Sequence, residues 1–246
     1  MKHKAALIAV VITLALMVVL SFIPFVHADV SGAESVTTIS TSRRAPLPAN
    51  EVDAQAGNIT ELFINATTVT QSWQGYYGNV TGFVTLQDGL NNTLYDWALA
   101  EPNGEIYAVN QTVDFASVDC FNYTATGGEI NLSTYEETLG IGQTDVDGVN
   151  ETFNSIYNGT FYAGLTKINA STYCYSTDLY QNSSSAGDEF VEVLLTDGQA
   201  VIYTALLENN VIGFDNRSHD FQMIVGEDGH TGNNAVTPYY FYVELE

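Results

Sequence analysis

The sequence predicts an all-β protein, an antiparallel β-sandwich of roughly eight to ten strands with a loop-rich insertion near residues 125–185. Three observations support this. Short runs of aromatic and β-branched residues alternate with polar ones, and glycine-containing turn signals separate the runs. From Gly57 onward only Pro102 and Pro238 interrupt the chain, and no internal repeat is present. A hydrophobic content of 46% over 246 residues is sufficient for a buried core.

A basic and then apolar leader precedes this fold. Lys2 and Lys4 are followed by an uncharged, mainly apolar run over residues 5–26, and Val26-His27-Ala28 offers a cleavage site before Asp29. Residues 1–28 are therefore predicted to be a signal peptide. Because the run is long enough to cross a bilayer, an uncleaved membrane anchor is the alternative. A cleaved signal peptide and an uncleaved anchor both place the rest of the chain, residues 29–246, outside the cytoplasm.

Residues 29–56 are rich in Ser, Thr, Ala and Pro and have no sustained apolar period. This composition predicts a linker. Within it, residues 36–41 (Val-Thr-Thr-Ile-Ser-Thr) form a β-prone run. On a flexible tether such a run could instead be a donor segment that pairs with a sheet edge of another subunit. Residues 57–246 are predicted to be the ectodomain.

The first half of the ectodomain is predicted to be an antiparallel meander. Strands are expected over residues 59–73, 79–87, 93–100 and 105–109. Pro102-Asn103-Gly104 lies between the last two, and Asn-Gly predicts a two-residue hairpin turn there.

The middle of the chain is less regular, and the strand pattern then returns. Ser133-Thr134-Tyr135-Glu136 resembles a capping box, which predicts a short helix over residues 134–139. Further strands are expected over residues 190–196, 199–207, 211–214, 221–225 and 239–245, with Asp197-Gly198 as a hairpin turn.

Charge limits the classes of partner. Removal of residues 1–28 leaves four basic residues against twenty-nine acidic ones, a net charge of −25. Such a chain repels phosphate backbones and anionic lipid surfaces, so nucleic-acid binding is excluded as a function.

Twelve Asn-x-Ser/Thr sequons predict dense N-glycosylation. Twenty asparagines and 41 Ser or Thr residues would produce only about three by chance, so the excess is about fourfold. The acceptor residues are Asn58, Asn65, Asn79, Asn91, Asn110, Asn122, Asn131, Asn150, Asn158, Asn169, Asn182 and Asn216.

Two cysteines occur, Cys120 and Cys174. In an exported protein an isolated pair most simply forms one disulfide, and two buried thiols are the alternative. No nucleophile elbow, zinc-protease or nucleotide-binding motif is present, and adjacent residues in Ser218-His219-Asp220 cannot form a catalytic triad on a strand. Paired carboxylates such as Asp96 with Glu105, across the predicted hairpin, leave a secreted hydrolase as a minor alternative.

Two segments have the residue types of binding sites. Asp145, Asp147 and Glu151 surround a glycine turn and offer oxygen ligands for calcium, although plain polar turns explain the pattern as well. No other cofactor is indicated. Trp73, Tyr76 and Tyr77 lie among glycines and could form an aromatic platform for sugar rings, with a core tryptophan and a turn as the alternative.

The segments around these residues resemble exported archaeal cell-surface glycoproteins that have no established activity. The resemblance is carried by WQGYYGNVTG at residues 73–82, EVLLTDG at 192–198 and YYFYVEL at 239–245, and it covers most of residues 60–246. It implies surface location and no catalytic residues.

Together these features favour a structural or adhesive surface glycoprotein, without enzymatic activity, that associates with itself or with other surface components as a filament or coat subunit. An extracellular carbohydrate- or ligand-binding module is the alternative.

Overall fold

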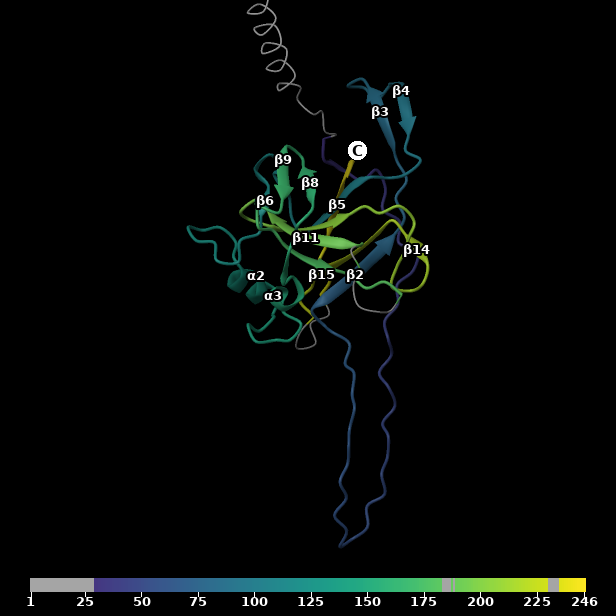
Figure 1. The fold of residues 1–246 in the computed structure, drawn as a ribbon, viewed down its shortest axis with the longest axis vertical. Coiled ribbons are helices and arrows are strands. Elements are labelled where there is room, and N and C mark those ends of the chain that lie inside the picture. The colour runs from purple at the N-terminus through teal and green to yellow at the C-terminus, as the bar shows by residue number, and fades with distance from the viewer. Residues whose placement is uncertain (1–28, 183–186, 188, 230–234) are drawn as a thin grey trace, which may run out of the picture.

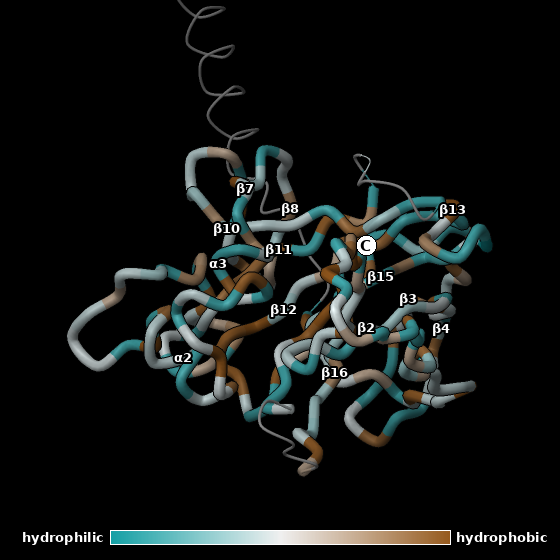
Figure 2. The backbone as a smooth tube through the Cα atoms, turned by 90° about the horizontal axis from the view of Figure 1, so that it is seen from below, coloured by the Kyte–Doolittle hydropathy of each residue, from teal (hydrophilic) through white to brown (hydrophobic). Residues whose placement is uncertain are grey.

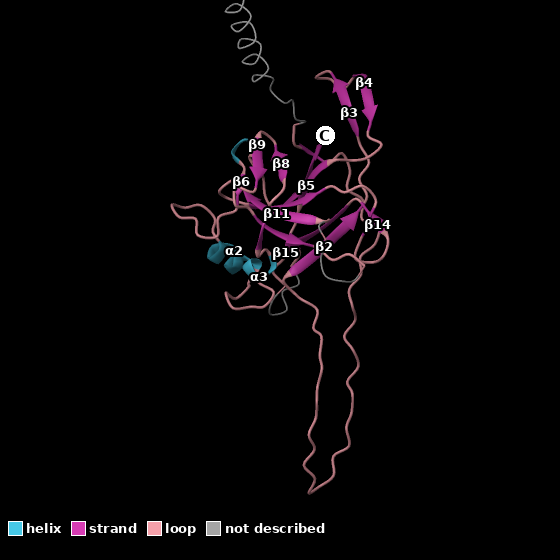
Figure 3. Ribbon diagram, viewed as in Figure 1, coloured by secondary structure: helices cyan, strands magenta, loops and turns pink. Residues whose placement is uncertain are grey.

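The computed structural model describes residues 29–182, 187, 189–229 and 235–246. The chain is mostly β, with 33% strand and 7% helix, and its sheets are antiparallel (Figures 1 and 3). The predicted all-β class is confirmed. The predicted leader, residues 1–28, lies outside the described residues. Within the described part of the chain, no helix is long and apolar enough to cross a membrane.

One eight-stranded sheet forms the centre of the molecule. Its strand order is β1-β16-β5-β12-β11-β10-β7, and β6 pairs with β11 on the edge opposite β12, the same edge that β10 occupies. The bounds are β1 Ser31–Gly32, β5 Gly104–Val109, β6 Asp119–Cys120, β7 Ser155–Ile156, β10 Tyr175–Asp178, β11 Val191–Thr196, β12 Val201–Leu206 and β16 Tyr240–Leu245.

The central strands are buried on both faces. Along β11, Leu194 belongs to a first hydrophobic cluster and its neighbours Val193 and Leu195 to a second, because successive side chains point to opposite faces of a sheet. Tyr203 on β12 faces the first cluster and Tyr107 on β5 the second. Brown, hydrophobic stretches of chain run through this centre in Figure 2.

Four two-stranded sheets surround the main one. The pair β2–β15 packs over the first cluster, through Met223 and Val225 of β15 and Trp73 and Tyr76 of β2. The hairpin β8–β9 packs over the second cluster through Phe161 and other residues. The strands are β2 Trp73–Gly78, β15 Phe221–Gly226, β3 Phe83–Gln87, β4 Thr93–Ala98, β8 Thr160–Ala163, β9 Thr166–Asn169, β13 Val211–Ile212 and β14 Ser218–His219.

Two short α-helices and one 3₁₀ turn lie in or near the insertion: α2 Leu132–Thr138, α3 Val149–Thr152 and η1 Phe115–Ser117. The capping residue of α2 is Asn131, whose side chain accepts from the backbone N–H of Thr134, while the Thr134 hydroxyl accepts from the backbone N–H of Asn131. The helix is thus found where it was expected, but its capping box begins at Asn131 and not at Ser133.

Two strand predictions in the first half are wrong. Residues 59–72 form no strand, and β2 begins only at Trp73. Asn103-Gly104 is not a hairpin turn, because β4 pairs with β3, whereas β5 pairs with β12 and β16. The local signals were those of strands and a turn, but the choice of partner depended on residues far away in the sequence.

The segment over residues 34–71 leaves the body as a long excursion, called the arm below. It departs after β1, turns at Gly57, where φ is +87° and Asn58 N donates to Gln55 O, and returns to β2 (Figure 1). Every residue of the arm is exposed except Val69, which is half-buried. The arm therefore buries almost nothing in this copy of the chain.

Candidate functional site

The predicted disulfide is present. Cys120 and Cys174 are bonded, with their Cα atoms 4.8 Å apart, and they join β6 to the residue before β10. A closed loop of 54 residues stabilises the folded state by about 4 kcal/mol on the chain-entropy estimate. A disulfide indicates an oxidising, extracellular-type environment.

None of the twelve sequon asparagines is buried. Eight are exposed, and the half-buried ones are Asn110, Asn131, Asn150 and Asn169. Several occupy turns, and Asn91, Asn182 and Asn216 have positive φ, the left-handed conformation that asparagine tolerates better than most residues. No sequon asparagine therefore lies in the buried core.

The three predicted platform residues do not share one surface. The indole Nε1 of Trp73 donates to Asp147 O at 2.7 Å, and the ring packs against the fully buried Phe153 with centroids 5.9 Å apart. Tyr76 packs edge-to-face on Phe241 at 5.2 Å. Of the three, only Tyr77 is exposed.

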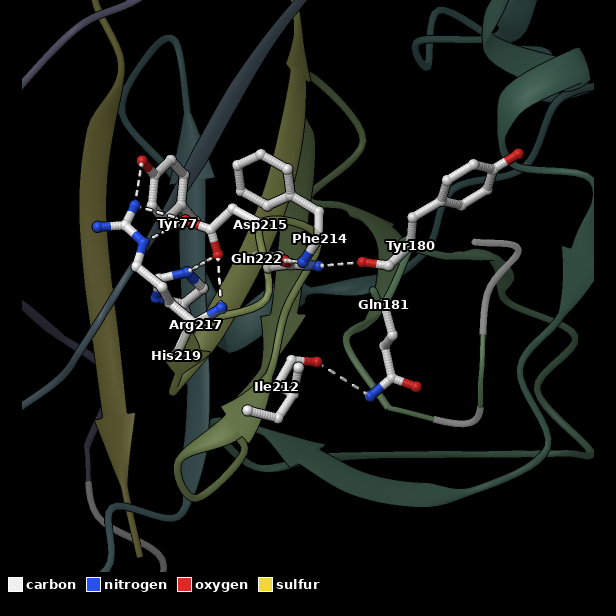
Figure 4. Close-up of polar contacts among 9 residues, drawn as sticks. All are labelled: Tyr77, Tyr180, Gln181, Ile212, Phe214, Asp215, Arg217, His219 and Gln222. Atoms are coloured by element: carbon white, nitrogen blue, oxygen red, sulfur yellow. Dashed lines mark hydrogen bonds and ion pairs between the residues drawn. The ribbon is translucent and has the colours of Figure 1, made fainter. Parts of the chain in front are cut away.

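Tyr77 belongs to a separate surface cluster (Figure 4). Its ring contacts Phe214 at a centroid distance of 4.9 Å and His219 at 4.8 Å. Asp215 joins the cluster, because it accepts from Arg217 Nε at 2.6 Å and lies 2.8 Å from His219 Nε2. Desolvation is the largest single effect on the pKa of Asp215 and raises it, but the bonds to His219 and Arg217 together outweigh it, and the pKa falls to about 2. The polar side chains of this cluster therefore bond to one another.

The predicted calcium ligands have local partners. Asp145 accepts from Gly142 N at 2.7 Å, and Asp147 accepts from Ser72 Oγ at 3.0 Å and from the Thr70 hydroxyl. Glu151 is exposed. Among the residues that the structure describes, no group of three or more His, Cys, Asp or Glu side chains is placed to hold a metal ion. The calcium site stays a prediction without a preformed set of ligands.

A buried polar network closes one edge of the two-stranded sheet β2–β15. Glu192 on β11 is fully buried, and its Oε2 accepts from Ile224 N at 2.9 Å. The hydroxyl of Tyr203 accepts from Gly226 N at 2.9 Å, and Tyr239 donates to Gly226 O at 2.6 Å. These groups belong to the edge of β15 that does not pair with β2. Burial raises the pKa of Glu192 well above its usual range, against the opposing effect of the bond from Ile224 N, and its Oε1 has no hydrogen-bond partner.

Among the residues that the structure describes, no strand lies beside the other edge of this sheet. Within that part of the chain β2 pairs with β15 alone, and Gln74, Gly75 and Tyr77 along it are exposed. β16 contacts this sheet through Phe241, which packs on Tyr76, and Val243 and Leu245 of β16 are only half-buried although they pack against the first cluster. Unpaired strand edges beside incompletely covered apolar side chains are sites for strand addition.

A second candidate is a cavity of about 340 Å³ on the opposite face of the main sheet, called the acidic pocket below. It lies where β5 begins and β12 and β16 end, under the hairpin β8–β9. Its lining includes three carboxyl groups and three aromatic rings: Glu105, Glu208, Glu246, Tyr157, Phe161 and Tyr162.

Glu105 is the unusual member of this pocket. It is 3% exposed, and its Oε2 has no hydrogen-bond partner. It pairs across the strands with Glu244, whose Oε2 accepts from Tyr107 at 2.8 Å and from Gly164 N at 2.9 Å. Burial, and then the charges of Glu244 and Glu246, raise the pKa of Glu105 to about 9. A buried carboxyl oxygen without a partner is costly, and a ligand in the pocket that bonds to it would remove this cost.

Sequence reasoning missed this pocket. The predicted hairpin places Glu105 opposite Asp96, but the strand partner of Asp96 is Thr85 on the separate hairpin β3–β4. The alternation in residues 239–245 placed Glu244 on the face opposite Val243, and only the pairing of β16 with β5 shows that Glu244 meets Glu105.

Comparison with known proteins adds no relative: the sequence matches no protein-family model, and no curated protein or solved structure matches it.

Proposed function

We propose that this chain is a structural, N-glycosylated protein of the cell surface that associates with further copies of itself as a filament or coat subunit. The observation that carries the proposal is the presence of two incomplete parts in one chain. The arm is exposed and carries apolar side chains that pack on nothing in this copy, and the open edge of β2 belongs to a sheet that contacts β16 through Tyr76 and Phe241.

The returning leg of the arm contains residue types that favour a β-strand, but it pairs with no strand that the structure describes. This leg contains Ile59, Phe63 and Ile64, which are 102%, 97% and 80% exposed. β-branched and aromatic residues in alternation favour a pleated, half-buried setting. In this copy these side chains are exposed, and the edge of a sheet in a second copy would supply a half-buried surface for them. In a two-layer, sandwich-like body, the arm of a neighbour would extend the second layer at β2.

Strand addition of this kind builds an open fibre. The donated arm and the accepting edge are different surfaces, so each added copy leaves one arm and one edge unused, which is a heterologous interface. The sequons are compatible with this function, because glycans on asparagines outside the core leave folding intact.

Substitutions in the two legs of the arm test the proposal. In the glycosylated, exported protein, Phe63→Ser with Ile64→Ser should abolish assembly measured by light scattering and negative-stain electron microscopy, while circular dichroism stays that of the folded body. The pair Val36→Ser with Ile39→Ser tests the departing leg, which carries the β-prone run of residues 36–41. Unchanged assembly in both variants would refute donation by the arm, and a strictly monomeric wild-type protein at high concentration would refute the function itself.

A binding module is the second candidate, and one observation favours it. Tyr95 and Trp97 on β4 are 60% and 50% exposed, with ring centroids 4.9 Å apart, and they lie opposite Leu86 and Val84 of β3. Exposed rings on a projecting hairpin suit stacking on sugars. Titration with oligosaccharides, read from tryptophan fluorescence, should show saturable binding that Trp97→Ala abolishes; no response to any neutral or acidic glycan would reject this candidate.

A further inference from the structure

We propose that the acidic pocket receives an arginine side chain, Arg43 or Arg44, from the arm of a second copy of this chain. This inference rests on the self-association proposed above and names a contact that would fix its register.

The pocket has the chemistry of an organic-cation site. Glu105 offers a buried carboxyl oxygen without a partner, and Glu208 and Glu246 add negative charge at the lining. Tyr157, Phe161 and Tyr162 provide aromatic rings in the same cavity. A guanidinium group suits both the carboxyl groups and the aromatic rings, because its planar donors match carboxylates and its face stacks on rings. The carboxylates are not placed as a metal centre: the described residues contain no metal-binding group of three.

The charge inventory points to Arg43 and Arg44. The described part of the chain has four Lys or Arg residues. Arg217 is bound to Asp215, and the Lys167 ammonium lies 5.9 Å from the Tyr162 ring centroid. Arg43 and Arg44 are both exposed and form no ion pair with the described acids. In a chain with so many acidic groups, an unpaired arginine dipeptide is the strongest available attraction between copies.

The positions of arm and pocket fit a head-to-tail contact. The C-terminus and β8, which border the pocket, lie at one end of the body, and the arm extends from the other end (Figure 1). Arg43 is ten residues beyond Ala33, so at about 3.3 Å per extended residue it reaches roughly 30 Å from the point of departure. One copy can therefore place its arginines at the opposite end of the next.

Binding would be coupled to proton release. Around Glu105 lie Glu244 on β16, Glu246 just after β16, Tyr107 on β5, Glu208 after β12 and Tyr157 after β7. No cationic residue is among the lining residues, and Lys167 Nζ lies 5.9 Å from the ring centroid of Tyr162, which is one of them. Because the pKa of Glu105 is raised to about 9, the acid is protonated at neutral pH, and an incoming guanidinium would drive its proton to solvent. Release of one proton makes the affinity rise up to about tenfold for each pH unit below that pKa.

The test uses the exported full chain with Arg43→Gln and Arg44→Gln, whose own arms cannot fill the pocket. A synthetic peptide of residues 38–49 is titrated by calorimetry at pH 6, 7 and 8. We expect saturable binding that strengthens with pH, and at least tenfold weaker binding of the same peptide carrying glutamine at both arginine positions.

Glu105→Gln in the same protein should weaken peptide binding at least tenfold and remove its pH dependence. Glu137→Gln, which removes one exposed charge on α2, is the matched control and should change neither. Equal binding of both peptides, or an unchanged affinity in Glu105→Gln, would overturn the inference even if the arm variants above abolish assembly. Binding of N-acetylarginine amide without binding of the peptide would also overturn it, because the pocket would then be a small-cation site. Failure of the wild-type protein to assemble refutes the proposed function instead.

Discussion

The body and the arm are made of similar residues and behave in opposite ways. Phe153 in the body is fully buried beneath β2, whereas Phe63 in the arm is 97% exposed. Both lie in stretches rich in Thr, Asn and aliphatic residues. The difference is the presence of a partner strand or sheet: main-chain hydrogen bonds and apolar burial stabilise a strand only when a second surface is within reach. We infer that the partner surface of the arm belongs to another molecule.

The largest expected contrast comes from truncating one phenylalanine in each region. Phe153→Ala should destabilise the monomer by about 4 kcal/mol, through lost transfer energy and the cavity left beside Trp73 and Tyr203. Phe63→Ala should change the unfolding free energy of the monomer by less than about 0.5 kcal/mol. Urea unfolding followed by circular dichroism measures both. Similar losses in the two variants would mean that the arm packs on its own body in solution.

A second contrast concerns the two strand edges of the β2–β15 sheet, one closed by side chains and one open. Glu192→Ala leaves Ile224 N without its acceptor and opens a cavity, and we expect a loss of about 3 kcal/mol in the same assay. Glu192→Gln keeps a carbonyl acceptor of the same size and should cost less than about 1 kcal/mol. If both substitutions are neutral, the edge of β15 is not held by this carboxyl group.

The two buried acids should make the body more stable in mild acid. The pKa of Glu105 is about 9, that of Glu192 is raised well above its usual range, and the unfolded value is 4.5. Between pH 4.5 and 9 the unfolded chain releases protons that the folded chain keeps, so stability falls as pH rises. The slope is at most about 1.4 kcal/mol per pH unit for each group.

Glu105→Gln and Glu192→Gln should each flatten this slope, which unfolding curves between pH 5 and 8 will measure. Repulsion among exposed acids also lowers stability as pH rises. The informative quantity is therefore the difference in slope between each variant and the wild type. A slope identical in all three proteins would contradict the assignment of neutral buried acids.

The smallest effect is expected at the cap of α2. Asn131→Ala should cost about 1 kcal/mol, because the backbone N–H of Thr134 loses its acceptor. Asn131→Asp removes the sequon but retains the cap, and it should restore stability. Should the aspartate variant be as unstable as the alanine variant, the loss would come from the glycan instead.

The sequence predicted local structure in the body well. The alternation in residues 190–196, 199–207 and 239–245 located β11, β12 and β16 nearly to their ends. β11 and β12 lie in the buried centre of one sheet, and β16 is half-buried in the same sheet, so each of the three packs at least one face against the core. The Cys120–Cys174 bond followed from the count of cysteines alone.

What the sequence could not provide was pairing between distant segments. The prediction of a strand over residues 59–73 used the correct propensity, but only Trp73 found a partner within the chain. The acidic pocket depends on Glu105 meeting Glu244, which lies 139 residues away. The Glu192 edge closure depends in the same way on the register between the main sheet and β15. Such contacts follow from topology, which local patterns do not encode.

Hydrogen exchange of the arm measures the central claim most directly. Deuterium uptake at residues 59–70 should be compared by mass spectrometry between monomeric protein and assembled material. The account predicts exchange at nearly unstructured rates in the monomer, because the arm has no backbone pairing there. It predicts strong protection in the assembled state, where those amides bond to the edge of β2 in another copy. Assembled material in which residues 59–70 still exchange as fast as in the monomer would contradict the claim.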